Sequence, residues 1–483
     1  MAARIAQVLL SLAVFVSLPS DPRAISHVLE RTSFGLRPGD VERVQAQGLE
    51  RYIEEQLHPE RLSDAGLDAR LSDFDTLRMS SRDIAQQFEM PLEDARKAAG
   101  AAAGDGKPSP EQRRAATVVQ ELQEQKVLRA IYSGRQLQEV LVDFWFNHFN
   151  VDARKGASRF LLTSYERDVI RPHVFGRFRD LLEATAKSPA MLFYLDNWQS
   201  VDPNGVHVDA PRGHFVRGPF GQPVFVQPPL RAPRQNANAP KGLNENYGRE
   251  LMELHTLGVD GGYTQQDVTE VARAFTGWTI ERPRQDGTFK FDPRLHDDGR
   301  KLVLGHVINA GGMNDGEQVL DLLARHPSTA RFIATKLVRH FVSDTPPPSL
   351  VDRVAARFRE TDGDLREVMR TLLLSPEFLS PDVYRQKIKT PFEFVVSAVR
   401  ATGAEVHDAR PLVNQIAQLG EPLYQCQPPT GYKDTADAWV NTGALVGRMN
   451  FGLALAGNRL RGIVVSNPTP DGIQLGAPEF QRR

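Results

Sequence analysis

The sequence predicts a mainly α protein, one large multi-helix globular domain that carries a small β-hairpin element. Apolar residues recur at helical spacing through most of the 483 residues, and Pro, Gly and N-cap residues separate these stretches. After Trp278, residues 285–287 (Gln-Asp-Gly) form a hairpin signal between residues 279–280 and 289–291. No Gly-rich phosphate loop or nucleophile elbow is present, which argues against nucleotide enzymes and serine hydrolases of the commonest types.

Composition narrows the classes of partner and cofactor. Lys and Arg number 59 against 60 acidic residues, so no global field attracts nucleic acid, and none is expected as a partner. The single cysteine, Cys426, excludes an intramolecular disulfide and any multi-cysteine metal site. We expect Cys426 to be a buried structural thiol, and any metal to use oxygen and imidazole ligands.

Residues 1–20 have the form of a secretory signal peptide. Arg4 precedes an apolar run that ends near Pro19, and polar residues follow it. This pattern predicts a periplasmic or secreted protein, whereas the alternative is an ordinary N-terminal helix that packs on the core. No other run approaches about eighteen apolar residues, so we expect no membrane span in the mature chain.

The rest of the chain divides by composition into parts of one domain. An apolar helix is expected over residues 137–149, and it must be nearly buried. A long stretch rich in Pro, Gly and Asn indicates a loop insertion, either a lid over a binding site or a disordered decoration. The predicted parts are an N-terminal helical part (21–199), the loop insertion (200–243), the central motif with the C-terminal helical part (244–456) and a C-terminal tail (457–483).

The central motif, residues 244–280, concentrates acids, a histidine and helix punctuation, and it predicts two helices. Asn244 is the expected N-cap of the first helix, and Gly258 is its expected left-handed C-terminal residue. Thr264, followed three residues later by Asp267, predicts a capping box at the start of the second helix. We expect this motif to mark the functional centre.

Three side chains of the first helix are candidates for catalysis: Glu250, Glu253 and His255. At about 100° per residue, His255 lies about 140° from Glu250 around the helix, so no Glu-x-x-His or His-Glu-x-x-His metal signature is present. Any site that includes these residues therefore needs groups from other segments. The alternative is a surface ladder of Glu245, Arg249 and Glu253, with His255 capping the helix end.

Two other places supply such groups. His148 ends the apolar helix beside Asn147, either as a hydrogen-bonded core residue or as a base near the negative end of the helix dipole. Residues 296–299 (His-Asp-Asp-Gly) place an imidazole and two carboxylates on one turn. That turn suits a hard cation or a general base, although such sequences are often simple turns.

Two functions from different classes remain open. The first is an exported hydrolytic or oxidative enzyme that uses a carboxylate and histidine site on an extracellular polymer such as a polysaccharide. The predicted site residues are Glu250, Glu253, His255 and His148 for catalysis; His255, His296 and Asp297 for a divalent metal; and Asn147, Arg249 and Trp278 for substrate binding. The second is a non-catalytic helical binding or assembly protein, in which the same residues form a buried network that fixes helix register.

Several passages carry a likeness to a known family. They are RTSFGLRPGDVERV, FWFNHFNV, NENYGRELMELHTLGVDGGYTQQDV, FTGW, HDDGRK, HPSTARFIATKLVRHFVSD, GDLREVMRTLLLSPEF, QPPTGYKDTADAW and RMNF. Together they resemble the bacterial family catalogued as domain of unknown function 1800, over nearly the whole chain from about Ala24 to Phe451. The resemblance implies a helical, exported protein, frequently encoded near a sulfatase-like companion, and it implies no activity.

Overall fold

The computed structural model describes residues 18–99, 107–205, 214–217, 223–226, 242–309, 311–466 and 472–483. Nearly all of the predicted signal peptide and most of the predicted loop insertion lie outside these residues. Within the insertion, the structure describes one antiparallel hairpin, in which β1 (His214–Arg217) pairs with β2 (Pro223–Val226). The choice between a lid and a decoration therefore falls outside the described residues.

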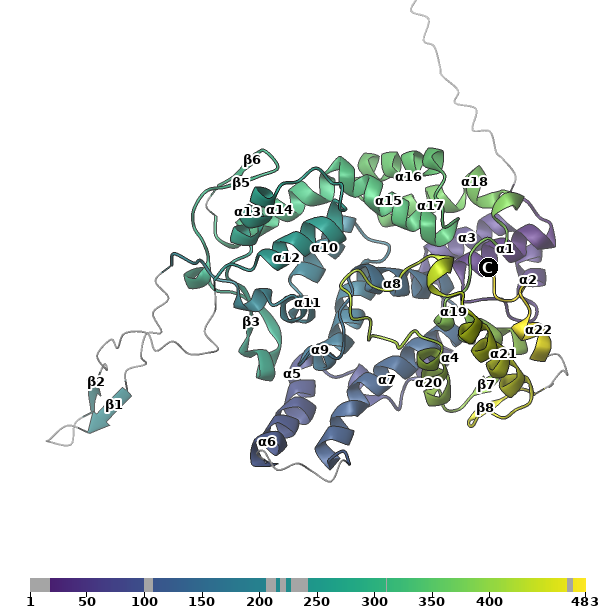
Figure 1. Cartoon of the computed structure of the whole chain (residues 1–483), viewed down its shortest axis with the longest axis horizontal. Helices are drawn as coiled ribbons and strands as arrows, with labels where there is room; N and C mark the ends of the chain where they lie inside the picture. Colours follow the sequence, from purple (N-terminus) through teal and green to yellow (C-terminus); the bar gives the residue numbers. More distant parts are fainter. Residues whose placement is uncertain are drawn as a thin grey trace, which may run out of the picture.

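The fold is mainly α, as predicted, and its sheets are small two-stranded antiparallel pairs (Figure 1). Among the described residues, no helix is long and apolar enough to cross a membrane. The α-helices before the loop insertion are α1 Pro22–Thr32, α2 Asp40–Gln47, α3 Leu49–Leu57, α4 Ala65–Arg70, α5 Ser81–Ile84, α6 Met90–Ala99, α7 Pro110–Tyr132, α8 Gln136–His148, α9 Ser158–Ser164, α10 Phe178–Ala186 and α11 Pro189–Tyr194.

The C-terminal half continues with helices and three further strand pairs. The α-helices after the insertion are α12 Glu245–Glu250, α13 Gln265–Ala274, α14 Met313–Arg325, α15 Pro327–Phe341, α16 Pro348–Glu360, α17 Leu365–Leu373, α18 Pro376–Leu379, α19 Pro391–Thr402, α20 Arg410–Gln418, α21 Thr442–Ala456 and α22 Gly472–Gly476. The strands are β3 Trp278–Glu281, β4 Thr288–Phe291, β5 Lys301–Val303, β6 His306–Ile308, β7 Glu405–Val406 and β8 Ile463–Val464. π-helical turns are η3 Ala85–Glu89, η4 Tyr165–Ile170, η7 Leu251–Thr256 and η8 Arg282–Asp286.

Helix α8 lies in the middle of the molecule, as its apolar sequence predicts (Figure 1). Trp145 and Phe149 of this helix end belong to one continuous core, and Phe178 of α10 packs 5.9 Å from the Trp145 ring. Burying each such ring contributes about 1.5–3 kcal/mol. Helices α1, α3 and α7 also contact α8, so neighbouring helices hold α8 in the fold.

The predicted hairpin after Trp278 is present, because β3 pairs antiparallel with β4 from Trp278 opposite Phe291 to Glu281 opposite Thr288. The connection is longer than a two-residue turn, since η8 precedes Gly287, whose φ is 56°. β5 and β6 form a further antiparallel pair, from Lys301 opposite Ile308 to Val303 opposite His306. The pair of β7 and β8 was not predicted, because each strand has two residues and carries no alternation.

The helix signals of the central motif are confirmed. The Asn244 side chain accepts from the Tyr247 amide at 3.2 Å, and Thr264 and Asp267 form a complete capping box. Gly258 has φ 81°, the left-handed conformation predicted for it. The first helix departs from regular α geometry in η7, where the Leu257 amide donates to the Met252 carbonyl at 2.7 Å. Angles counted at 100° per residue therefore fail beyond the start of η7.

Candidate functional site

The predicted surface ladder on the first helix of the central motif does not form. Arg249 donates to Gln265 Oε1 at 2.5 Å, and the Gln265 amide donates to Glu245 at 2.9 Å. Glu253 accepts from the Tyr263 hydroxyl at 3.1 Å. In the part of the chain that the structure describes, no ion pair joins Arg249 to Glu245 or Glu253. The Arg249 guanidinium instead donates to Gln265 of α13. Arg249 thus links α12 to α13.

Glu250 lines an open cavity of about 690 Å³, which it shares with Asp152, Arg154 and Asn246. Burial raises the pKa of Glu250, and the neighbouring Glu253 adds to the effect. Among the residues that the structure describes, no histidine lines this cavity. The structure therefore does not join Glu250 to the imidazoles with which it was predicted to act.

His148 and His255 lie near each other, with 6.4 Å between their ring centroids. The Lys336 amine donates to His148 Nδ1 at 2.9 Å, so His148 Nε2 carries the hydrogen that is donated to the His255 carbonyl at 3.1 Å. Burial lowers the pKa of His148 well below its ordinary value and that of His255 to about 3, with Lys336 adding to both effects. Both rings are buried and neutral at physiological pH, which suits helix positioning.

The predicted turn at residues 296–299 is engaged by other partners. His296 Nε2 lies 3.3 Å from Asp315 Oδ2, and the Lys301 amine donates to the same oxygen at 2.6 Å. Arg273 Nε donates to Asp297 Oδ2 at 2.7 Å. Burial favours raising the pKa of Asp297, but hydrogen bonds from Arg273 outweigh it and hold that pKa below its ordinary value. This arrangement ties α13 and α14 to the turn.

The predicted metal ligands His255, His296 and Asp297 therefore do not converge on one ion. Across the described residues, no group of three or more His, Cys, Asp or Glu side chains is arranged to hold a metal. Trp278, predicted to bind substrate, is fully buried, and its ring packs 4.8 Å from Phe275. It is a core residue of the β3 hairpin.

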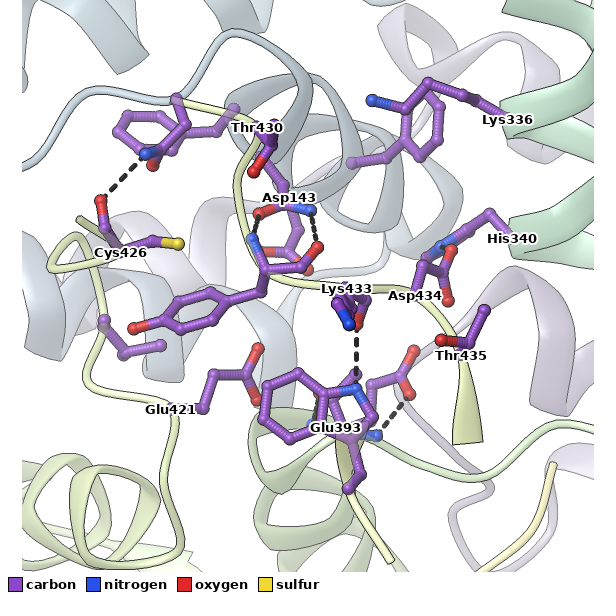
Figure 2. A pocket seen from close by; sticks show the side chains of 18 of the residues that line it. Asp143, Lys336, His340, Glu393, Glu421, Cys426, Thr430, Lys433, Asp434 and Thr435 are labelled. Atoms are coloured by element: carbon purple, nitrogen blue, oxygen red, sulfur yellow. Dashed lines mark hydrogen bonds and ion pairs between the residues drawn. The ribbon is translucent and has the colours of Figure 1, made fainter. Parts of the chain in front are cut away.

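A second cavity, of about 270 Å³, gathers more titratable groups than the central motif. It lies between α8, α15, the start of α19 and residues 421–439, which we call the strap (Figure 2). Its ionisable lining residues include Lys126, Asp143, Lys336, Arg339, His340, Glu393, Glu421, Lys433 and Asp434. We call this space the strap cavity.

The end of α8 holds the strap in place. Asn147 donates to the Tyr432 carbonyl at 2.9 Å and accepts from the Tyr432 amide at 2.7 Å. Asn150 donates to the carbonyls of Cys426 and Pro428 at 2.8 and 2.9 Å. Asn147, predicted to bind substrate, thus lines the cavity and fixes its wall.

Gly431 makes this close approach possible. Its φ is 74°, and a Cβ at this position would lie 2.2 Å from the Asn147 carbonyl oxygen. No other residue type fits both the backbone conformation and the space. The strap therefore depends on a glycine as well as on two asparagines.

Glu421 is a buried acid of the strap cavity. Its Oε2 accepts from the Phe392 amide at 2.8 Å, at the beginning of α19. Burial, helped by the nearby Asp143, raises the pKa of Glu421 to about 8, against the effect of the Phe392 amide. At neutral pH the side chain is therefore mostly a neutral carboxylic acid that can release a proton.

Asp434 is the opposite case on the same strap. Its carboxylate contacts His340 Nδ1 at 2.7 Å and the Lys387 amine at 3.0 Å. Burial alone favours raising its pKa, but His340, Lys387 and Arg483 outweigh burial and hold the pKa of Asp434 far below its ordinary value. The side chain is 26% exposed, so an ionised carboxylate remains within reach of solvent.

The remaining acids of the cavity are paired. Asp143 lies 2.5 Å from the Lys126 amine, and that amine also lies over the Tyr424 ring at 5.0 Å. Glu393 lies 2.9 Å from the Arg483 guanidinium, which is buried. Cys426 is buried as predicted, and burial raises the pKa of its thiol to about 12, which keeps it unreactive.

Sequence reasoning missed Glu421 and Asp434. No site residue was predicted in the strap, because its acids have no helical or strand spacing relative to α8 or α15. The signal that points to them is the pair of asparagines that flank the Phe149 end of α8, since buried amides need backbone partners from another segment.

Comparison with known proteins yields a family. A family model described as "Protein of unknown function (DUF1800)" matches residues 27–480. The searches of curated proteins and of solved structures returned no match. The matched range includes both the central motif and the strap.

Proposed function

The chain belongs to the DUF1800 family, and we propose that it is a hydrolytic enzyme that cleaves a C–O bond in an extracellular polymer such as a polysaccharide. The observation that supports this proposal is the pair of carboxyl groups at the strap cavity. Glu421 is protonated and Asp434 is ionised at neutral pH. Environments that shift the pKa values of two carboxyl groups of one site in opposite directions are typical of a catalytic acid and its ionised partner.

In the proposed reaction, Glu421 donates its proton to the oxygen that leaves. Asp434 faces the positive charge that develops at the carbon losing that oxygen, and a water molecule supplies the new bond. His340 and Lys387 keep Asp434 ionised and oriented. These roles use side chains that line one cavity, whereas Glu250, Glu253 and His255 lie on a separate helix.

The size and access of the cavity agree with this chemistry. A volume of about 270 Å³ is just below the usual range for ligand sites, so it suits one unit of a polymer rather than a long segment. Thr430 and Lys433 of the strap are exposed, and they border the route from solvent. Figure 2 shows Glu421 and the Asp434–His340 pair in the lining of this space.

A non-catalytic binding or assembly protein is the second candidate. It is favoured by the buried contacts of His148, His255 and Lys336, which link α8, η7 and α15 without reaching solvent at the imidazoles. Such a network fixes helix register in either kind of protein. The two proposals differ in what the strap cavity does to a bound polymer.

We also propose a periplasmic or secreted location, which rests on the leader sequence, and a sulfatase-like companion, which rests on the family resemblance. Fractionation of cells that express the full chain, followed by detection of the protein in each fraction, tests the location. Recovery of the protein with its first twenty residues intact in the cytoplasm would contradict it.

The decisive experiment is a reducing-end assay of the full chain on a panel of purified polysaccharides. We expect release of new reducing ends from at least one polymer, and a loss of about 100- to 10,000-fold in kcat for Glu421→Gln. Glu89→Gln is the matched control, because burial also raises the pKa of Glu89, to about 7, and Glu89 does not line the strap cavity. No release by the unmodified chain, or equal loss in both variants, would overturn the proposal.

A further inference from the structure

The cations of the strap cavity divide into paired and unpaired groups. Lys126 is matched by Asp143 at 2.5 Å. Lys336 and Arg339, one turn apart on α15, and Lys433 of the strap also line the cavity. In the described parts of the chain, none of these three has a carboxylate oxygen within 4.0 Å, whereas ion pairs are frequent elsewhere on the molecule.

The hydrogen bonds of these cations leave donors free. The Lys336 amine uses one donor on His148 Nδ1, at 2.9 Å, and an ammonium has three. Arg339 directs Nε to the Asp344 carbonyl at 3.5 Å, a long contact that leaves the two terminal nitrogens of its guanidinium. Lys433 is exposed. Each cation therefore keeps hydrogen-bond donors for a ligand.

The acids that face these cations are already matched. Asp143 is paired with Lys126, Glu393 with Arg483, and Asp434 with both His340 and Lys387. Glu421 is neutral at physiological pH, because burial raises its pKa to about 8. The cavity consequently presents more positive charge to a ligand than its own carboxylates neutralise.

We propose that Lys336, Arg339 and Lys433 form a subsite for an anionic substituent, a carboxylate or a sulfate ester, on the sugar unit that enters the strap cavity. This inference rests on the proposed function and names its substrate class. The planar Arg339 fork matches either oxyanion through two parallel hydrogen bonds, and the two ammonium groups add charge from α15 and from the strap.

The protonation of Lys336 gives this subsite a signature. Burial lowers the pKa of Lys336 to about 8, and Arg339 lowers it too, although Asp434 acts in the opposite direction. A bound anion favours the charged amine and raises that pKa. Binding is therefore accompanied by proton uptake near pH 8 and above, and affinity falls as pH rises past 8.

The test is isothermal titration calorimetry on the Glu421→Gln protein, which holds a ligand without the proposed acid. The probes are glucuronate, glucose 6-sulfate and glucose at millimolar concentrations, in buffers of different ionisation enthalpy at pH 8.5. We expect at least one anionic sugar to bind ten-fold or more tightly than glucose, with proton uptake. Adding Lys336→Met and Arg339→Met should lower that affinity about 10- to 100-fold.

Controls separate charge from folding. Arg331→Met removes a cation from the same helix, outside the cavity, where Arg331 pairs with Asp352, and it should leave affinity unchanged. Lys433→Met changes an exposed residue without disturbing the core, and it should weaken anion binding several-fold. Tighter binding of glucuronate assigns a carboxylate, and tighter binding of glucose 6-sulfate assigns a sulfate ester.

Three outcomes would overturn the subsite: no binding of either anionic sugar, equal binding of glucose, or anion binding that Lys433→Met and the α15 variants leave unchanged. The proposed function fails in a different experiment, the reducing-end assay. A chain that binds an anionic sugar but releases no reducing ends would keep the subsite and lose the enzyme.

Discussion

The central motif and the strap cavity both collect polar side chains, but they collect them in different ways. In the motif, the contacts either cap one helix, as Thr264 and Asp267 do for α13, or join neighbouring helices, as Arg249 and Gln265 do. In the cavity, the charged groups come from helices and a strap that are far apart in sequence. In this protein, polar residues that are close together in the sequence cap and join helices. Ionisable residues that are distant in sequence but close in space form the candidate site.

The largest expected effect on activity comes from removing the ionised acid of the strap cavity. Asp434→Asn should lower kcat on the responsive polymer about 100- to 10,000-fold, because the amide cannot offset a developing positive charge. Asp267→Asn is the matched change in the central motif, where the carboxylate serves a capping box. It should leave kcat within a few-fold. The reducing-end assay measures both.

Reversal of these two effects would make the central motif the functional centre. Because Asp434 also pairs with His340 and Lys387, its removal leaves buried cations and costs stability as well. Circular dichroism and urea unfolding of Asp434→Asn therefore accompany the assay. A folded variant with full activity would show that the cavity carboxylate has no part in the reaction.

A second prediction concerns the glycine that seats the strap. Gly431→Ala places a Cβ against the Asn147 carbonyl at 2.2 Å and forces a left-handed alanine. We expect a loss of about 2–4 kcal/mol in the free energy of unfolding, from overpacking and backbone strain together. Urea unfolding measures the change.

Gly403→Ala is the control for backbone strain alone. Gly403 ends α19 with φ 61°, and a Cβ there meets nothing within 4 Å. It should cost about 1 kcal/mol. Equal losses in the two variants would mean that the close contact between the strap and α8 adds nothing to stability.

The elements that were predicted correctly are determined by residues close together in the sequence. The Thr264 and Asp267 capping box, the Asn244 cap and the β3–β4 hairpin each depend on residues a few positions apart, and all three are present. The π-helical turn η7 was not predicted, because a regular wheel assumes one constant angle per residue. The positions that the wheel predicted for side chains after Glu250 are therefore wrong.

The strap cavity, in contrast, is formed by residues that are far apart in the sequence. Asn147 and Tyr432 are 285 residues apart and are joined by two hydrogen bonds. Neither the pKa of Glu421 nor that of Asp434 follows from its neighbours in sequence, because burial mainly raises the first and cations from other segments lower the second. The family resemblance included the strap passage, but it assigned no role to these acids.

The pH dependence of activity sharpens the assignment of Glu421. The reaction needs the protonated acid, so activity should be present below pH 8 and fall about ten-fold per pH unit above the pKa of about 8. Asp434 stays ionised at neutral pH and below, because cations hold its pKa far under its ordinary value. The profile of kcat/KM against pH reports these groups in the free enzyme.

An alkaline limb near the usual carboxylate range would contradict this assignment, since it would mean that Glu421 is not the proton donor. Lys336 titrates at about the same pH, so the profile is repeated with Lys336→Met. We expect the alkaline limb to persist in that variant. Its disappearance would transfer the essential proton from Glu421 to Lys336.

The smallest expected effect comes from the central motif. Thr264→Ala removes the side chain that accepts from the Asp267 amide at 3.3 Å, and it should lower the free energy of unfolding by about 1 kcal/mol. None of the described residues of α13 is among those that line the strap cavity, so kcat should not change. Urea unfolding and the reducing-end assay on the same preparation test the two halves of this expectation. A 100-fold loss of kcat in a fully folded variant would mean that the motif acts in the reaction and that its density of polar residues was functional after all.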